Sequence, residues 1–366
     1  WLHTMLFSAW AVIVCPVVAH DGPVTHAKHV MLEKEVTELQ SHDEAVQAAG
    51  KPGPWRLPEG LEVGALVETE ASYSHTPSDD EEDLSLATVE LFGGWQVVNW
   101  LRGDLVLLYE EDNTEPMDVD QAIVTFGDTE VFPLYVQAGK QYVPFGHLDS
   151  QFVSDPIVLE LSESQETAAL LGVEHRNFNA SASVYDGDVE TDGDNTIENA
   201  VLATSYGFAR TNSTIHFGGA WIRNIMDSDG LTGVLEDADY AYTDHNTGGL
   251  DVWATATYGD ATLITEYVTA VDEIHVDGVD TGLKPSSMNL ELGYGLTERV
   301  EVAGKYEHAD DVADWFAENR YGAVGRVKVL ENDWLNVGVA LEYMREDFDE
   351  GAEDADVVTL QLSIDV

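Results

Sequence analysis

Residues 250–267 read LDVWATATYGDATLITEY, and this stretch is the clearest indication of the fold. Apolar side chains occupy every second position from Leu250 to Tyr258, the turn residues Gly259 and Asp260 follow, and the alternation resumes from Leu263 to Tyr267. A period of two places successive side chains on opposite faces of a β-strand. The stretch therefore predicts an antiparallel hairpin with one apolar face and one polar face.

The same alternation recurs along most of the chain, in segments of roughly ten residues. It is typical of a transmembrane β-barrel, in which lipid-facing and lumen-facing side chains alternate. The sequence therefore predicts an all-β fold, a transmembrane antiparallel β-barrel of about sixteen strands over residues 57–366. A soluble β-sandwich is the alternative. Further alternating segments are Leu61 to Val67, Trp95 to Tyr109, Met288 to Leu296, Tyr321 to Val329, Leu335 to Tyr343 and Val358 to Val366.

Short turns alternate with long, acidic loops between these segments. In bacterial barrels the short turns lie on the periplasmic side and the long loops outside, so both termini are expected to be periplasmic. Short turns are expected at Gly93-Gly94, Asp128 to Val131, Glu174 to Arg176, Thr211-Asn212, Gly259-Asp260, Thr297-Glu298 and Glu331 to Asp333. Long loops are expected at His75 to Asp83, Glu110 to Pro116, Pro144 to Gln165, Asp186 to Asn195, Asn224 to Thr247, Asp272 to Pro285, Ala309 to Asn319 and Glu346 to Ala355.

Aromatic residues at the ends of the expected strands suit the girdles that membrane barrels place at the two lipid–water interfaces. Together with the loop rhythm, they predict a location in the outer membrane of a Gram-negative bacterium. The residues are Trp95, Tyr109, Trp253, Tyr294, Trp334 and Tyr343.

The composition is strongly acidic. The 366 residues include 69 Asp and Glu but 16 Lys and Arg, which gives a formal net charge of -53. The excess lies mainly in the expected outer loops, for example at Asp79 to Asp83, and a saline habitat would screen its self-repulsion. Divalent cations that bridge the loops to lipopolysaccharide are the alternative. This charge opposes nucleic-acid binding and disfavours an anion pore, which needs rings of Lys or Arg.

The first 56 residues precede the expected barrel. Residues 1–19 are expected to be a signal peptide, because Met5 to Ala19 is a short apolar run with Pro16 near its end. Cys15, the single cysteine, would leave with it. Residues 20–56 are expected to form a short periplasmic helix and a linker. The heptad-like seam Leu32, Val36, Leu39 and Val46 favours either a coiled coil between subunits or a solvated tether.

Several segments resemble the LbtU-type siderophore porin family. They are Asp118 to Gly127 (DVDQAIVTFG), Leu134 to Gly146 (LYVQAGKQYVPFG), Ser154 to Ala168 (SDPIVLELSESQETA), Leu107 to Glu110 (LLYE) and Trp221 to Leu231 (WIRNIMDSDGL). The N-terminal heptad helix is similar too. The resemblance implies an outer-membrane porin linked to the uptake of iron-siderophore complexes. Two features differ from the family pattern, since the last residue is Val366 rather than an aromatic residue and the loops are unusually acidic.

The third long loop, Pro144 to Gln165, is the candidate for a pore constriction. In sixteen-stranded general porins the third loop folds inward, and the analogy predicts the same arrangement here. Facing charges of opposite sign would select permeants, or alternatively they would simply pair within a polar lumen. The expected acidic constriction is Asp149, Asp155, Glu160 and Glu163, and the expected basic wall is Arg102, Arg299, Lys305, Arg326 and Lys328.

Other chemistry is weakly indicated. The segment Asp186 to Asn195 (DGDVETDGDN) resembles the start of an EF-hand loop but lacks the final glutamate. A weak cation site and a solvated acidic loop are both open interpretations. The sequence contains no convincing set of nucleophile, base and orienting residue, so neither an enzyme nor a cofactor is expected. The candidate cation ligands are Asp186, Asp188, Asp192 and Asp194.

The sequence as a whole predicts an outer-membrane porin for passive transport with a cation-leaning pore. The expected partners are membrane lipid, lipopolysaccharide, a ferric siderophore or small cationic solutes, and identical subunits, as in a trimer. The alternatives are a general cation-selective porin and a surface adhesin or structural barrel.

Overall fold

The computed structural model describes residues 60–111, 117–147, 149–189, 196–237, 245–276, 279–280, 283–312, 316–332, 334–348 and 352–366. The expected signal peptide (1–19) and periplasmic helix (20–56) lie outside the described residues. Among the residues described, no helix is both long enough and apolar enough to cross a membrane.

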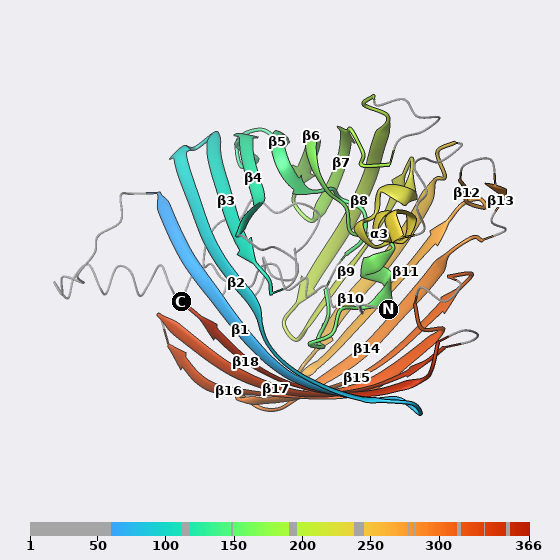
Figure 1. Ribbon diagram of the computed structural model, residues 1–366. Helices are drawn as coiled ribbons and strands as arrows, with labels where there is room; N and C mark the ends of the chain where they lie inside the picture. The colour runs from blue at the N-terminus through green and yellow to red at the C-terminus, as the bar shows by residue number, and fades with distance from the viewer. Residues whose placement is uncertain are drawn as a thin grey trace.

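Sixteen antiparallel strands form a closed barrel, which confirms the predicted fold class and strand number (Figure 1). The barrel closes because β1 pairs with β2 on one side and with β18 on the other. Its strands are β1 (Leu61–His75), β2 (Asp80–Val98), β3 (Leu101–Tyr109), β4 (Asp118–Gly127), β5 (Leu134–Tyr142), β6 (Gln165–His175), β7 (Phe178–Tyr185), β8 (Asn199–Arg210), β9 (Ser213–Ile222), β10 (Gly249–Tyr258), β11 (Ala261–Ala270), β14 (Ser286–Thr297), β15 (Val300–Asp310), β16 (Asn319–Asn332), β17 (Leu335–Asp347) and β18 (Ala355–Asp365).

The remaining elements lie in the long loops. The strands β12 (His275–Val276) and β13 (Val279–Asp280) make a separate two-stranded sheet between β11 and β14. Loop 3, residues 143–164, contains the short helix α2 (Ile157–Glu160). Loop 5, residues 223–248, contains the 3-10 helix η1 (Ile225–Asp227) and the helix α3 (Asp229–Asp237). Both α2 and α3 lie within the ring of strands in Figure 1.

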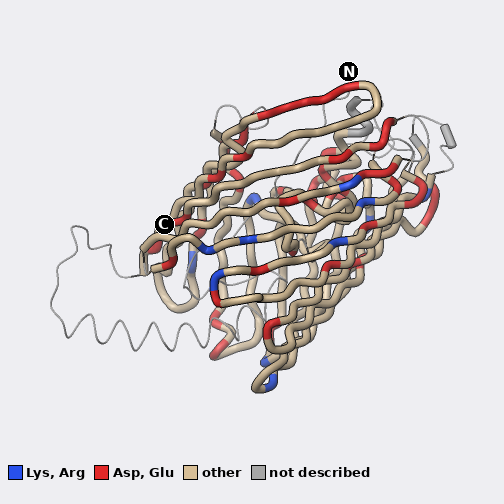
Figure 2. Tube along the Cα trace, turned by 90° about the horizontal axis from the view of Figure 1, so that it is seen from below, with Lys and Arg blue, Asp and Glu red and all other residues tan. Residues whose placement is uncertain are grey.

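Side chains alternate between the two faces of the barrel wall as the sequence predicts. On β14, Leu290 and Leu292 are 42% and 63% exposed, whereas Glu291 between them is fully buried. The outward positions form an apolar belt of the kind that faces lipid. Asp and Glu greatly outnumber Lys and Arg along the chain, and many of them lie at strand ends and in loops (Figure 2).

Six of the seven expected short turns separate consecutive strands, but the turn expected at Gly93-Gly94 is wrong. Both glycines lie inside β2, and the turn into β3 falls at residues 99–100. A Cβ atom on Gly94 would lie 2.5 Å from Nη2 of Arg102. The missing side chain of Gly94 therefore leaves room for the Arg102 side chain to lie over β2. The first long loop is also shorter than expected, because β2 begins at Asp80 and extends the hairpin.

The girdle expectation is wrong for Trp253. This side chain is 6% exposed and faces the interior, since the outward positions of β10 are those of Leu250 and Val252. Four of the other expected girdle residues are exposed: Trp95, Tyr294, Trp334 and Tyr343.

Three buried rings on the inner wall cover glycines directly opposite them on neighbouring strands. The pairs are Tyr135 with Gly172, His216 with Gly207 and Trp253 with Gly218. A Cβ atom on each glycine would lie 2.1, 2.5 and 2.6 Å, respectively, from the facing ring. A ring that lies over a cross-strand glycine fills the missing side-chain volume and helps to pin the strand register.

We expect Gly172→Val to destabilise the barrel by about 2 kcal/mol, because the new side chain would overlap the Tyr135 ring. The matched control is Gly103→Val on β3, where an added Cβ atom has no neighbour within 4 Å. Urea unfolding of protein refolded into liposomes measures both variants. Equal midpoints for the two variants would contradict the role of the ring.

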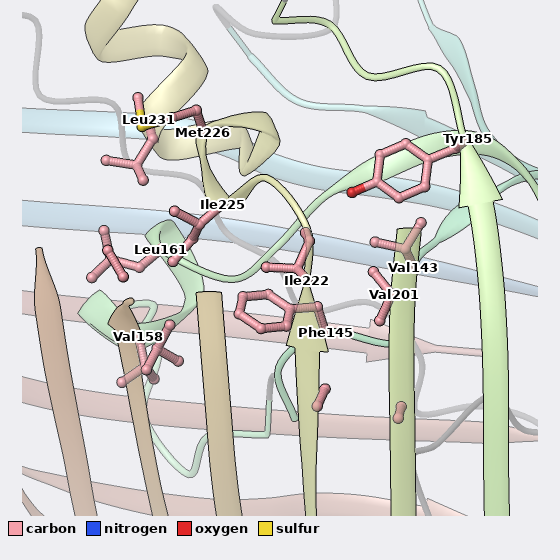
Figure 3. Packing of buried hydrophobic residues seen from close by; sticks show 14 of the residues in the cluster. Val143, Phe145, Val158, Leu161, Tyr185, Val201, Ile222, Ile225, Met226 and Leu231 are labelled. Carbon is pink, nitrogen blue, oxygen red and sulfur yellow. The ribbon is translucent and has the colours of Figure 1, made fainter. Parts of the chain in front are cut away.

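Loops 3 and 5 fold inward and pack against each other and against the wall. Val158 and Leu161 of loop 3 join Ile225, Met226 and Leu231 of loop 5 in one cluster, and all five are fully buried (Figure 3). The wall contributes residues of β6 to β9 and β11, including Tyr185, Val201 and Ile222. The inward position of loop 3 was predicted from the sequence, whereas that of loop 5 was not.

Candidate functional site

Four glutamates of the barrel wall accept hydrogen bonds from the main chain of loop 3. Glu266 of β11 accepts from the His147 N–H at 2.7 Å, and Glu307 of β15 accepts from the Ile157 N–H at 2.7 Å. The other two glutamates bond the stretch of loop between these points. Glu291 of β14 accepts from the Gln151 N–H at 2.6 Å and from the Ser150 Oγ at 2.7 Å, and Glu342 of β17 accepts from the N–H groups of Val153 and Ser154.

Three basic side chains hold the carbonyl groups of the same stretch. Arg326 donates to the Phe152 carbonyl at 2.9 Å, Lys305 to the Ser154 carbonyl at 3.2 Å, and Arg320 to the Asp155 carbonyl at 2.8 Å. The Lys305 ammonium also lies 4.8 Å from the centre of the Phe152 ring. Buried main-chain groups need such partners, so the wall of β11 and β14 to β17 fixes the path of loop 3.

The same wall charges form ion pairs with one another. Lys305 lies 3.4 Å from Glu291, and both side chains are fully buried. Arg320 lies 3.4 Å from Glu307 and 3.0 Å from Glu346. Removing one partner of such a buried pair leaves an uncompensated charge, so this network and loop 3 depend on each other.

The first turn of loop 3 is also held by stacking. The His147 ring lies parallel to the inward-facing Trp253 ring, with centroids 3.8 Å apart and planes 4° apart. The His147 Nε2 atom lies 3.1 Å from a carboxylate oxygen of Asp149. Trp253, which the sequence alone suggested for the lipid interface, therefore positions the loop inside the barrel.

The four acidic residues expected at the constriction divide into two groups. Asp149 and Asp155 lie on the stretch bound by the wall glutamates and arginines, and the Asp149 side chain is 35% exposed. Glu160 and Glu163 lie beside loop 5 instead. The Glu163 carbonyl accepts a 2.8 Å hydrogen bond from the Asp229 N–H, and a Cβ atom on Gly230 would lie 2.7 Å from the Glu160 Oε2 atom.

The five basic residues expected on the pore wall also separate. Lys305 and Arg326 reach loop 3, as described above. Arg102 pairs within its own part of the wall, with Glu62 at 2.9 Å and with Asp104 at 2.8 Å. Arg299 and Lys328 are exposed near the short-turn end of the barrel, where Lys328 lies 3.7 Å from Glu331. The pore roles assigned to these residues stay predictions.

The cation site expected between Asp186 and Asp194 falls only partly within the structure. Asp192 and Asp194 lie outside the described residues. Across the described residues, no three or more His, Cys, Asp or Glu side chains are arranged to hold a metal ion. The weak cation site therefore stays a prediction.

Loop 5 is a further element inside the barrel, and its inward position was not predicted from the sequence. The buried amide of Asn199 on β8 donates to the Asn224 carbonyl at 2.8 Å and to the Asp227 carboxylate at 2.6 Å. The Val189 N–H donates to the same carboxylate at 2.9 Å. A signal was present in the sequence, because Ser228 precedes apolar residues at 231, 234 and 235, which is the spacing of a short capped helix.

Proteins of similar sequence carry no assigned activity in their names. A UPF0422 protein of Coxiella burnetii is 24% identical over 322 residues, which is 83% of this chain and 67% of that protein. A UPF0422 protein of Legionella pneumophila (strain Lens) is 22% identical over 91% of this chain and 68% of its own length. No family model matches the chain.

Solved structures of similar fold include an outer-membrane channel and an anion-selective porin. OprB of Pseudomonas putida aligns with a TM-score of 0.60 at 11% identity, over 84% of this chain and 94% of its own. The DcaP channel of Acinetobacter baumannii gives 0.57 at 11% identity, over 86% of this chain and all of its own. An anion-selective porin of Comamonas acidovorans gives 0.56 at 12% identity, over 83% and 98% of the two chains. The chain therefore has the porin fold.

We expect Glu291→Ala to destabilise the protein by about 3 kcal/mol, because it removes the acceptor of two loop 3 donors and leaves Lys305 buried without one partner. Glu331→Ala is the matched control, since the Glu331 side chain is 59% exposed. Its effect should stay within about 0.5 kcal/mol. Urea unfolding in liposomes gives the stability, and hydrogen exchange over residues 149–157 reports the release of the loop. Unchanged exchange in Glu291→Ala would contradict the anchoring role.

Proposed function

We propose that the protein is a passive outer-membrane channel whose lumen is narrowed by loop 3, with both chain termini on the periplasmic side. The observation that carries this proposal is the attachment of loop 3 across β11 and β14 to β17 through both its donors and its acceptors. A loop held in this way constrains the cross-section of the barrel, which is the requirement for size selection. The apolar outer belt supports contact with membrane lipid, and the acidic loops support contact with lipopolysaccharide through divalent cations.

We further propose that the pore favours cations. The chain has a net charge of -53, and many of its few basic side chains are engaged in ion pairs. Arg102, Arg223, Lys305, Arg320, Lys328 and Arg345 all lie within 4.0 Å of a carboxylate. These pairs leave an excess of negative charge to act on passing ions.

Iron-siderophore complexes are the proposed permeants. The support is the sequence resemblance of residues 107–110, 118–127, 134–146, 154–168 and 221–231 to the LbtU-type siderophore porins. Those residues include the two ends of loop 3 and the start of loop 5, the two segments that occupy the lumen. A trimer is the proposed assembly, and one solved neighbour, OmpT of Vibrio cholerae, has a trimer form.

We expect reversal potentials across a salt gradient in planar bilayers to give a clear cation preference at low salt and a weak one at molar salt. The physical reason is screening, which shortens the reach of the carboxylates from about 10 Å at 0.1 M to about 3 Å at 1 M. Anion preference at low salt would contradict the proposal. The absence of any steady conductance would favour a surface adhesin.

We expect Arg326→Gln to change the entry of a ferric trihydroxamate complex into chelator-loaded liposomes, because it removes the contact with the Phe152 carbonyl that holds loop 3. Lys328→Gln is the matched control, two residues along the same strand and exposed. The double variant should behave as Arg326→Gln does. Equal entry through all variants would reject the role of the constriction, and entry no faster than into empty liposomes would reject the siderophore proposal.

A further inference from the structure

Loops 3 and 5 meet through an apolar contact that has carboxyl groups at its edge. Val158 and Leu161 pack in the cluster formed by Ile225, Met226 and Leu231, as Figure 3 shows. Glu160 lies between Val158 and Leu161 of loop 3, Glu163 follows Leu161, and Asp229 lies between Met226 and Leu231 of loop 5. The main chains are joined there by the hydrogen bond from Asp229 to Glu163.

Loop 5 is itself anchored by groups that lie outside the strands that bind loop 3. Its partners are Asn199 of β8 and the main chain of Val189 in the fourth long loop. The wall glutamates that hold loop 3 belong to β11, β14, β15 and β17. The α2 end of loop 3 is therefore held from two sides, by the wall near Ile157 and by loop 5 near Glu163.

We propose that loop 5 positions the α2 end of loop 3, and that the carboxyl groups of Glu160, Glu163 and Asp229 make this position depend on pH. For its effect on conductance, the inference rests on the channel function proposed above. The contact between the loops is a property of the fold and does not depend on that function. Asp229 is a positioning residue in this account.

The direction of the pH dependence follows from burial. Burial raises the pKa of Glu160 to about 7 and that of Asp229 to about 7, from ordinary values of 4.5 and 3.8, and it raises the pKa of Glu163 well above its usual value. Protonation therefore stabilises the contact. The stability that protonation gives to the contact is fully present at a pH below the ordinary pKa of carboxyl groups, and it is lost as the pH rises through about 7.

The neighbouring charges favour the same direction. Most are acidic, so each additional ionised group in the contact meets repulsion, and Lys140 and Arg320 offset only part of it. The charged or titratable groups that act on these three carboxyls are Asp120 of β4, Lys140 and Tyr142 of β5, Asp155 of loop 3, Glu166 of β6, Tyr185 of β7, Asp188 of the fourth loop, Glu307 of β15 and Arg320 of β16.

Hydrogen exchange of the full chain in liposomes, corrected for the intrinsic pH dependence of exchange, tests the inference without any need for conduction. We expect protection at residues 157–164 and 225–231 to fall by roughly tenfold or more between pH 5 and pH 8, which is the effect of one pKa unit or more. The triple variant Glu160→Gln, Glu163→Gln and Asp229→Asn should keep its protection at pH 8. Glu130→Gln, an exposed carboxyl in the turn before β5, is the charge control and should behave as wild type.

A second variant separates positioning from charge. Met226→Ala keeps all three carboxyls but removes a fully buried side chain from the contact, so protection of residues 157–164 should fall at pH 5 as well. Single-channel traces of the same proteins should show conductance that varies with pH in wild type and not in the triple variant. Equal wild-type protection at pH 5 and pH 8 would overturn the pH dependence, and unchanged loop 3 protection in Met226→Ala would overturn the positioning by loop 5. A silent bilayer with the expected exchange results would reject the channel proposal alone.

Discussion

The pairing of main-chain N–H and C=O groups away from water is the constraint on which the rest of this structure depends. In a bilayer no water is available to the strands, so the sheet must close, and β1 meets β18 for that reason. Inside the barrel the same requirement falls on loop 3, which has no strand partner of its own. Glutamates and basic residues of the wall supply the missing acceptors and donors.

This arrangement gives the charged side chains of the lumen a structural role. Lys305, Arg320 and Arg326 bind main-chain carbonyls of loop 3, and Glu291, Glu307 and Glu342 bind its N–H groups. The opposite charges on this wall thus hold a loop in place as well as neutralise one another. A substitution chosen to change permeant charge at these positions would also move the loop, so exposed neighbours such as Lys328 are the informative controls.

The barrel interior near β6 to β11 is filled with buried apolar side chains, so it resembles the core of a soluble protein more than the lining of a water-filled pore. Loop 5 brings Ile225, Met226 and Leu231 against loop 3, and the buried amide of Asn199 holds the entry to loop 5. Loop 3 leaves the wall between β5 and β6, loop 5 leaves it between β9 and β10, and the two loops share one small core. Such a core couples the positions of the two loops, because a cavity or a buried charge in one loop also disturbs the packing of the other.

Local patterns in the sequence determined the barrel, its sixteen strands and most of its short turns, because a period of two and turn residues such as Gly259-Asp260 act over a few neighbouring positions. The inward position of loop 3 was predicted from its place in the order of loops. Tertiary structure alone decided which wall residue binds which loop atom, since Glu342 and Val153 are 189 positions apart in the chain. It also placed Trp253 inside the barrel, Gly94 within a strand and loop 5 against loop 3. Each of these outcomes depends on what lies across the lumen or on the next strand, and no local pattern in the sequence records that contact.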